Sequence, residues 1–150
     1  MRKIFIGADS AGFPLKEKLI TKLVGLGYEV VDCGTDSTAS CHYPDFAAAV
    51  CKNVQKDLDG SFGILVCGTG IGMSMCANKY KGIRAALCSD TYSARMTREH
   101  NDANVLCMGA RVIGECLAED ILDAFLGASF EGGRHKTRVD MMTEIENGTK

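Results

Sequence analysis

Residues 62–72 have the sequence FGILVCGTGIG, an uninterrupted apolar run that ends in a glycine-rich turn. A continuous apolar run of this length is typical of a strand buried in the middle of a parallel sheet. The turn leads directly into a segment of helical character that extends to about Tyr80. A strand, a tight turn and a helix in this order form the repeating unit of open α/β domains.

The same alternation continues on both sides of this stretch. Apolar runs predict strands at residues 3–8, 28–33, 62–67, 83–88 and 104–108. Helical spacing and start signals predict helices at about 14–26, 44–56, 71–80, 91–100, 115–126 and 134–147. The 150 residues suit one domain. We therefore predict a single α/β domain with three α/β/α layers and a five-stranded parallel sheet, whose ligands bind at the carboxyl ends of the strands.

The composition excludes several classes of protein. With 17 basic and 19 acidic residues the net charge is −2, which argues against a nucleic-acid partner held by a basic surface. No apolar run approaches the roughly 20 residues that a membrane span needs, and residues 4–6 are too short for a signal peptide. The eight cysteines are evenly spread without a Cys-x-x-Cys pair, so we expect reduced thiols in a cytoplasmic protein without a metal site.

The glycine turn, residues 68–72, predicts a site for an anion or an oxyanion, because glycines allow close approach and a helix start offers free N–H groups. A tight turn without a ligand is the alternative. A dinucleotide fingerprint would need a glycine at Met73 or Met75, and a Walker-type loop would need a Gly-Lys pair. The first turn places Asp9 where it would repel a pyrophosphate. A nucleotide cofactor is therefore not expected.

Three side chains are candidates for proton transfer. Cys67 is the last residue of the central strand, where N–H groups at a helix start favour a thiolate, although a buried core cysteine is the alternative. His100 ends a predicted helix, where it could transfer protons or simply complement the helix dipole. Asp9 follows the first strand, so it should face the ligand crevice, unless it only caps a turn.

Basic side chains near the C-terminus are candidates for binding phosphate. Arg111 follows the fifth strand, and Arg134 and Arg138 share one face of the last helix, with His135 beside them. Guanidinium groups bind phosphate in a bidentate manner. A solvated basic face is the alternative. The Gly-Gly break before this helix makes docking against another subunit plausible.

Together these features resemble the family that contains ribose-5-phosphate isomerase B, the galactose-6-phosphate isomerase subunits and allose-6-phosphate isomerase. The resemblance rests on eight ordered blocks that cover nearly the whole chain: Gly7-Ala8-Asp9, Asp32-Cys33-Gly34-Thr35, Tyr43-Pro44-Asp45, Cys67-Gly68-Thr69-Gly70-Ile71-Gly72, Ala77-Asn78-Lys79, Gly82-Ile83-Arg84-Ala85, Glu99-His100-Asn101-Asp102-Ala103-Asn104 and Glu131-Gly132-Gly133-Arg134-His135.

The resemblance implies a Rossmann-like, metal-independent aldose–ketose isomerase without a cofactor, which acts on ribose 5-phosphate and ribulose 5-phosphate in the pentose phosphate pathway. Cys67 would move the proton between carbons 2 and 1 through an enediolate, and Thr69 would move a proton between the oxygens. His100 and Asp9 would assist ring opening. The implied substrate-binding residues are Ser10, Gly68, Gly70, Ile71, Gly72, Met73, Ser74, Asn101, Arg111, Arg134, His135 and Arg138.

The resemblance also implies a homodimer or homotetramer, in which the helix at about 134–147 brings Arg134 and Arg138 to the active site of a partner subunit. One residue departs from the family pattern, because Ser10 stands where the family usually has a histidine near the phosphate. A six-carbon sugar phosphate, an unphosphorylated sugar or a non-catalytic sugar-phosphate sensor therefore remain alternatives. The presence of His100 favours ribose over galactose substrates.

Overall fold

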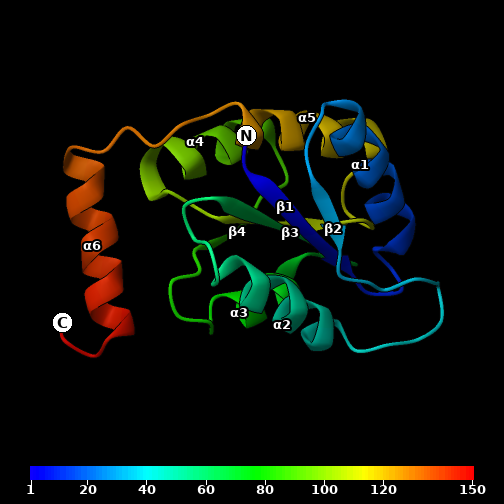
Figure 1. The fold of residues 1–150 in the computed structure, drawn as a ribbon, viewed down its shortest axis with the longest axis horizontal. Coiled ribbons are helices and arrows are strands. Elements are labelled where there is room, and N and C mark those ends of the chain that lie inside the picture. The colour runs from blue at the N-terminus through cyan, green and yellow to red at the C-terminus, as the bar shows by residue number, and fades with distance from the viewer.

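The computed structural model describes all of residues 1–150 and confirms the predicted α/β class. One parallel sheet has the strand order β2-β1-β3-β5-β4 (Figure 1). Its strands are β1 (Lys3–Ala8), β2 (Val30–Asp32), β3 (Ser61–Cys67), β4 (Ala85–Leu87) and β5 (Val105–Gly109). The helices are α1 (Phe13–Gly25), α2 (Tyr43–Val54), α3 (Ile71–Ala77), α4 (Thr91–Asn101), α5 (Glu115–Leu126) and α6 (Arg134–Glu146).

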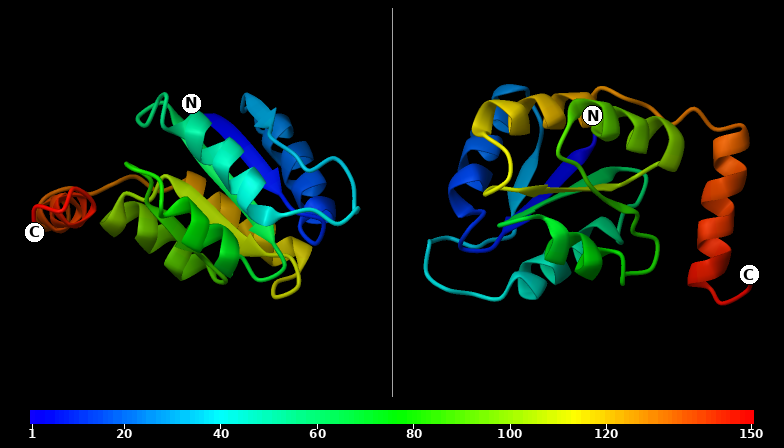
Figure 2. Two further views of the ribbon diagram at one scale, coloured as in Figure 1. Left: turned by 90° about the horizontal axis from the view of Figure 1, so that it is seen from below. Right: turned by 180° about the vertical axis from the view of Figure 1, so that it is seen from behind.

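Helices cover both faces of the sheet, which gives the predicted three layers (Figures 1 and 2). Because successive strand residues point to opposite faces, β3 contributes to two cores. Phe62, Ile64 and Val66 pack with α1, α4 and α5, whereas Leu65 and Cys67 pack with α2 and α3. All seven residues of β3 are buried, as the apolar run predicts for a central strand.

The order of the strands determines where a ligand can bind. From β1 the chain goes first to β2 on one side and then to β3 on the other. The loops after β1 and β3 therefore leave the sheet in opposite directions, and a crevice forms between them at the carboxyl ends of the strands. These loops begin at Asp9 and at Gly68, which the sequence already marks as candidates.

A partly buried ion pair holds the edge of this crevice. The side chain of Lys16 in α1 is fully buried, and its Nζ lies 2.6 Å from Oδ1 of Asp32 at the end of β2. The same oxygen accepts a hydrogen bond from the Gly34 N–H, and the Gly34 carbonyl accepts one from the Ala8 N–H. The pair thus ties the loop after β2 to the end of β1, one residue before Asp9.

The last helix stands apart from the three layers. Figures 1 and 2 show α6 at one end of the molecule, joined to the rest by an extended connection. Only His135 and Val139 of this helix are buried, whereas Met142 is 40% and Ile145 66% exposed. No helix in the chain has both the length and the apolar character needed to cross a bilayer.

Candidate active site

Cys67 lies at the tip of the central strand and is only 5% exposed. Its Sγ accepts a hydrogen bond from the Gly70 N–H over 3.1 Å, because the glycine turn folds back over the end of β3. An N–H donor aimed at sulfur stabilises the thiolate, which is the reactive form of cysteine. The contact that the sequence predicts between this thiol and the turn is therefore present.

Three other thiols belong to the hydrophobic core. Burial raises the pKa of Cys51 to about 12 and the pKa of Cys88 to about 11. Burial likewise raises the pKa of Cys107 well above its ordinary value. These three thiols stay protonated at neutral pH, so they behave as small apolar side chains.

The first turn of α3 leaves two N–H groups free for an anion. The Gly70 N–H binds the Cys67 sulfur, the Ile71 N–H binds Oγ1 of Thr69 at 3.2 Å, and the Ser74 N–H binds the Gly70 carbonyl. The N–H groups of Gly72 and Met73 have no acceptor within the chain. Donors at the first turn of a helix commonly remain open in this way, and they can hold an oxyanion.

The glycine turn needs glycine at position 70 for two reasons, the backbone conformation there and the close packing around it. The φ of Gly70 is +78°, a left-handed conformation that costs a side chain energy. A Cβ at this position would lie 2.5 Å from Cδ1 of Leu87 and 2.9 Å from the carbonyl carbon of Met108. The turn therefore passes so close to β4 and β5 that only glycine fits.

We expect Gly70→Ala to lower the free energy of unfolding by roughly 2–4 kcal/mol, since it adds a close contact to a strained φ. Urea unfolding followed by circular dichroism measures the change. Gly114→Ala is the matched control, because Gly114 has a φ of −77° and no atom within 4 Å of the added Cβ. Equal stability of the two variants would contradict this account of the turn.

The loop after β1 lies against the glycine turn. The Asp9 N–H donates to the Val66 carbonyl at 3.2 Å, and Oδ1 of Asp9 accepts the Gly12 N–H at 3.0 Å. Asp9 thus caps its own turn through one oxygen, while Oδ2 makes no hydrogen bond within the chain. A Cβ on Gly68 would lie 3.9 Å from Cβ of Ala11, so the two loops face each other closely.

Arg111 completes this group from the end of β5. Its N–H donates to the Gly68 carbonyl at 3.0 Å. A Cβ on Gly68 would lie 3.5 Å from Nη1 of Arg111, so the guanidinium group lies over the glycine turn. Since Arg111 is exposed, the guanidinium group is available to an anion in the crevice.

Tyr43 is a neighbour of the site that the sequence reasoning missed. A Cβ on Gly72 would lie 2.4 Å from Cε1 and 3.0 Å from the phenol oxygen of Tyr43, so this ring rests against the start of α3. The signal was the Tyr43-Pro44-Asp45 block, which was interpreted only as the beginning of a helix and as part of the resemblance. Its phenol oxygen therefore lies close to Gly72, at the start of α3.

His100 and Asn101 occupy the opposite edge of the sheet. Helix α4 runs antiparallel to the strands, so its last residues return to the beginning of β5. There the Asn101 carbonyl accepts a hydrogen bond from Nε of Arg84, just before β4 begins. Within one chain, the structure does not bring His100 or Asn101 together with Cys67.

The predicted residues of α6 lie with His100. The rings of His100 and His135 are stacked, with centroids 4.1 Å apart and planes 8° apart. Arg134 and Arg138 belong to the same helix and are exposed. The predicted site residues thus form two groups, one around Cys67 and one around His100, at opposite edges of the sheet.

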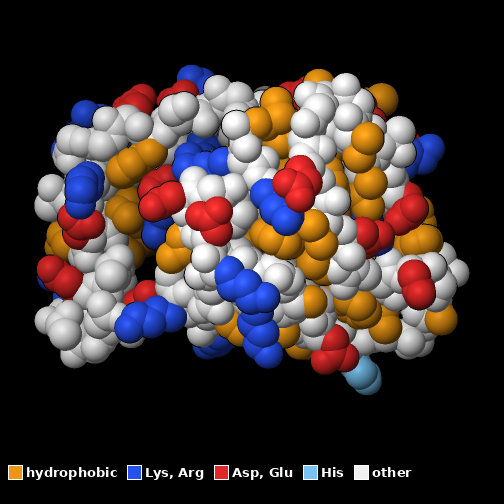
Figure 3. All heavy atoms as spheres, viewed as in Figure 1, with side chains coloured by type: hydrophobic (Ala, Val, Ile, Leu, Met, Phe, Trp, Pro, Cys, Tyr) orange, Lys and Arg blue, Asp and Glu red, His pale blue; other side chains and the backbone are white.

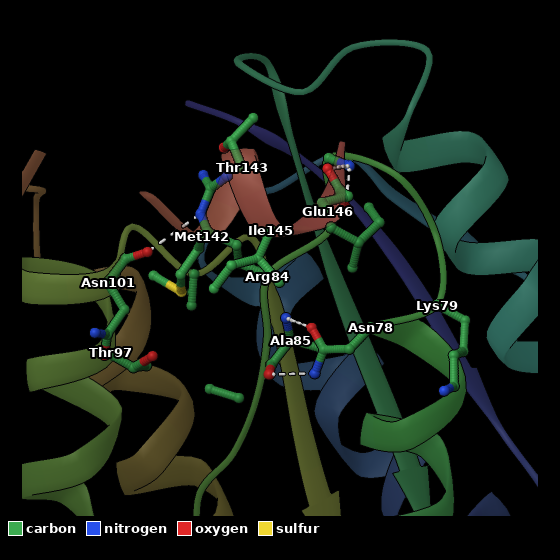
Figure 4. Close-up of a pocket in the computed structure, with 14 residues that line it drawn as sticks. Asn78, Lys79, Arg84, Ala85, Thr97, Asn101, Met142, Thr143, Ile145 and Glu146 are labelled. Atoms are coloured by element: carbon green, nitrogen blue, oxygen red, sulfur yellow. Dashed lines mark hydrogen bonds between the residues drawn. The ribbon is translucent and has the colours of Figure 1, made fainter. Parts of the chain in front are cut away.

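A cavity of about 720 Å³ separates α6 from the body of the molecule. Figure 4 shows Arg84 and Asn101 on one side of it and Met142, Ile145 and Glu146 of α6 on the other. The space-filling view shows an opening beside α6 with charged side chains at its rim (Figure 3). This cavity therefore lies next to Asn101 of the His100 group and not at Cys67.

Comparison with known proteins supports this description. A model of the Ribose/Galactose Isomerase family matches residues 4–142. The chain is 51% identical over 147 residues to ribose-5-phosphate isomerase B of Escherichia coli (strain K12), covering 97% of each chain. It is 47% identical to ribose-5-P isomerase B of Listeria innocua, covering 96% of this chain and 97% of that one.

Solved structures agree with these relatives. Ribose-5-phosphate isomerase B of Clostridium thermocellum superposes with a TM-score of 0.95 at 50% identity, covering 99% of both chains. The enzyme of Mycoplasma genitalium with bound ribulose-5-phosphate gives 0.94 at 42% identity, covering 97% of this chain and 96% of that one. The resemblance predicted from the sequence blocks is confirmed. Since the family model and the relatives span almost the whole chain, the protein belongs to the ribose/galactose isomerase family.

Proposed function

We propose that the protein is an aldose–ketose isomerase that interconverts ribose 5-phosphate and ribulose 5-phosphate. The observation that carries this proposal is the Cys67 sulfur, hydrogen-bonded to the Gly70 N–H beside the open N–H groups of Gly72 and Met73. A base next to oxyanion donors is what abstraction of a proton beside a carbonyl group requires. The relatives named above carry the same activity in their names.

In the proposed reaction the Cys67 thiolate removes the proton from carbon 2 of the open-chain aldose. The electrons of the broken C–H bond form the carbon 1–carbon 2 double bond, and the carbonyl oxygen becomes negatively charged. The free N–H groups of Gly72 and Met73 stabilise this enediolate. The Thr69 hydroxyl relays a proton between the two oxygens, and the Cys67 thiol returns its proton to carbon 1 to give the ketose. No atom or electron is gained or lost.

We propose that the His100 group reaches this site from a partner subunit. In a two-fold dimer every contact between the two subunits occurs twice. One edge of the first sheet can therefore meet the opposite edge of the second sheet, and the symmetry forms two such shared sites. The exposed apolar side chains of α6 support such a contact, since Met142 is 40% and Ile145 66% exposed. The shared site would hold the phosphate between Arg111 of one subunit and Arg134 and Arg138 of the other. A homodimer or homotetramer satisfies this geometry.

Ring opening would use acid–base groups from both subunits. Oδ2 of Asp9, which has no hydrogen bond within the chain, can accept a hydroxyl proton of the cyclic sugar. His100 of the other subunit is 36% exposed in the single chain and can exchange a proton with the ring oxygen. Asn101 and His135 would line the same cavity.

Free cysteines at all eight positions support a cytoplasmic setting, where thiols stay reduced.

We expect kcat/KM to be highest for ribose 5-phosphate, lower for allose and galactose 6-phosphates, and reduced by roughly a hundredfold or more for unphosphorylated ribose. The last effect follows because charge-assisted hydrogen bonds of arginine to phosphate contribute about 1.5–3 kcal/mol each. Product formation measured by NMR with each sugar tests this order. Faster turnover of a six-carbon substrate would favour that alternative function.

The non-catalytic alternative arises from Ser10, which supplies no charge or titratable proton to the phosphate region. Thermal stabilisation of the protein by ribose 5-phosphate, with no ketose formed at any enzyme concentration, would favour a sensor over an enzyme.

A further inference from the structure

The connection to α6 passes the end of α4 (Figure 1). Two imidazoles and a carboxylate, from His100, His135 and Glu131, lie close together there. Nε2 of His135 lies 3.5 Å and Nε2 of His100 lies 4.0 Å from Oε2 of Glu131. The ligand atoms of all three residues lie within 4.8 Å of one another. The Glu131 N–H donates to the Glu99 carbonyl at 3.0 Å, which fixes the connection against the end of α4.

These distances suit a small divalent cation. Zinc binds imidazole nitrogen and carboxylate oxygen at about 2.0–2.2 Å, so tetrahedral ligands lie about 3.4 Å apart. The separation of Glu131 from His135 is close to this value. The rings of His100 and His135 are stacked with planes 8° apart, so both side chains must turn before their Nε2 lone pairs, which lie in the ring planes, can meet at one ion. Two histidines and one carboxylate leave a fourth position open. Glu131 is 51% exposed in the single chain, so an ion can reach the cluster from solvent.

An unpartnered atom points into the same cluster. His135 is 5% exposed, and its Nε2 is buried without a hydrogen bond. A buried polar atom without a partner is costly, so a partner from outside the chain is favoured.

We propose that His100, Glu131 and His135 bind a divalent transition-metal ion such as Zn²⁺, and that this ion inhibits the enzyme. The inhibition rests on the proposed function, since the ion would occupy the nitrogen lone pair that His100 uses in ring opening. The ion is therefore not a cofactor, and turnover requires it to be absent. The sequence predicts no metal, because it lacks the paired Cys and His spacings of a structural zinc site. Glu131 and His135 are four residues apart, and His100 joins them only in the folded chain.

Titration of the full-length protein with Co²⁺ tests the site directly. Nitrogen and oxygen ligands are expected to give a visible tetrahedral spectrum without a near-ultraviolet band from sulfur. Glu131→Gln should weaken Co²⁺ affinity roughly tenfold or more. Glu144→Gln is the matched control, because Glu144 is an exposed residue of α6 outside the cluster. Equal affinities of wild type and Glu131→Gln, or a sulfur-to-cobalt band, would overturn the proposal.

Activity measurements separate this inference from the proposed function. Zn²⁺ should inhibit the wild-type enzyme and a chelator should restore it, whereas Glu131→Gln should need roughly tenfold more Zn²⁺ for the same inhibition. If the enzyme is active but Zn²⁺ inhibits wild type and Glu131→Gln equally, inhibition through this site is wrong, whereas the proposed isomerase function is unaffected. If the protein shows no isomerase activity in the presence of a chelator, the proposed function is wrong. The Co²⁺ titration would still test the metal site in that case.

Discussion

Cys67→Ala is expected to lower kcat for ribose 5-phosphate by about 10²–10⁴-fold, because it removes the proposed base that moves the proton. KM should change little, since the sulfur acts in the transition state rather than in binding. Exchange of the carbon 2 hydrogen for deuterium in D₂O, followed by NMR, should fall by the same factor. This readout reports proton abstraction even when no ketose accumulates.

Two further substitutions sharpen the result. Cys67→Ser keeps an atom that can accept the Gly70 N–H, but the hydroxyl ionises far less readily than a thiol, so its activity should remain close to that of Cys67→Ala. Cys116→Ala removes an exposed thiol away from the turn and should behave as wild type. Undiminished deuterium exchange in Cys67→Ala would show that another group is the base.

Mixing two impaired variants is expected to restore activity. Arg138→Ala should lower kcat/KM by roughly ten- to a hundredfold, because it removes one charged contact to phosphate. If Arg138 acts on the partner's site, a hybrid dimer of Cys67→Ala and Arg138→Ala contains one intact site and one doubly defective site. Random association makes half of the dimers hybrids, so the mixture should recover about a quarter of wild-type activity.

The hybrid experiment is performed by mixing the variants in denaturant, refolding them together and assaying with substrate well below KM. A mixture of Cys67→Ala with Cys67→Ser serves as the control, since neither chain can supply the thiol. Activity that stays at the sum of the separate variants would mean that each chain uses its own Arg138, and the shared-site geometry would have to be abandoned.

The fold was predictable because its central strands are read directly from apolar runs. The residues of β3 and β5 are all buried, so their sequences are continuously hydrophobic. Edge strands gave a weaker signal. Residues 28–33 predict a longer strand than β2, which covers Val30–Asp32. The flanking residues Glu29 and Cys33 still share backbone hydrogen bonds with β1. The predicted helix at 71–80 likewise ends at Ala77.

The site was predictable only in part. The glycines before a helix predict the turn, and the position of Cys67 at the end of the strand predicts that its sulfur lies beside that turn. The location of His100 was also implicit in the topology, since a helix between parallel strands returns the chain to the opposite edge. The cluster of His100 with Glu131 and His135 was not implicit, because it depends on how a long connection and α6 pack against α4.

The close fit of the glycine turn affects how the enzyme would lower its reaction barrier. Gly70 lies against Met108 and Leu87, and Gly72 lies against Tyr43, so the backbone around the two open donors is immobilised by tight packing. Dipoles that are already oriented need no reorganisation when negative charge develops, unlike water molecules around a free sugar. The catalytic electrostatics are therefore built during folding, and the chain contributes them as a rigid, preorganised environment.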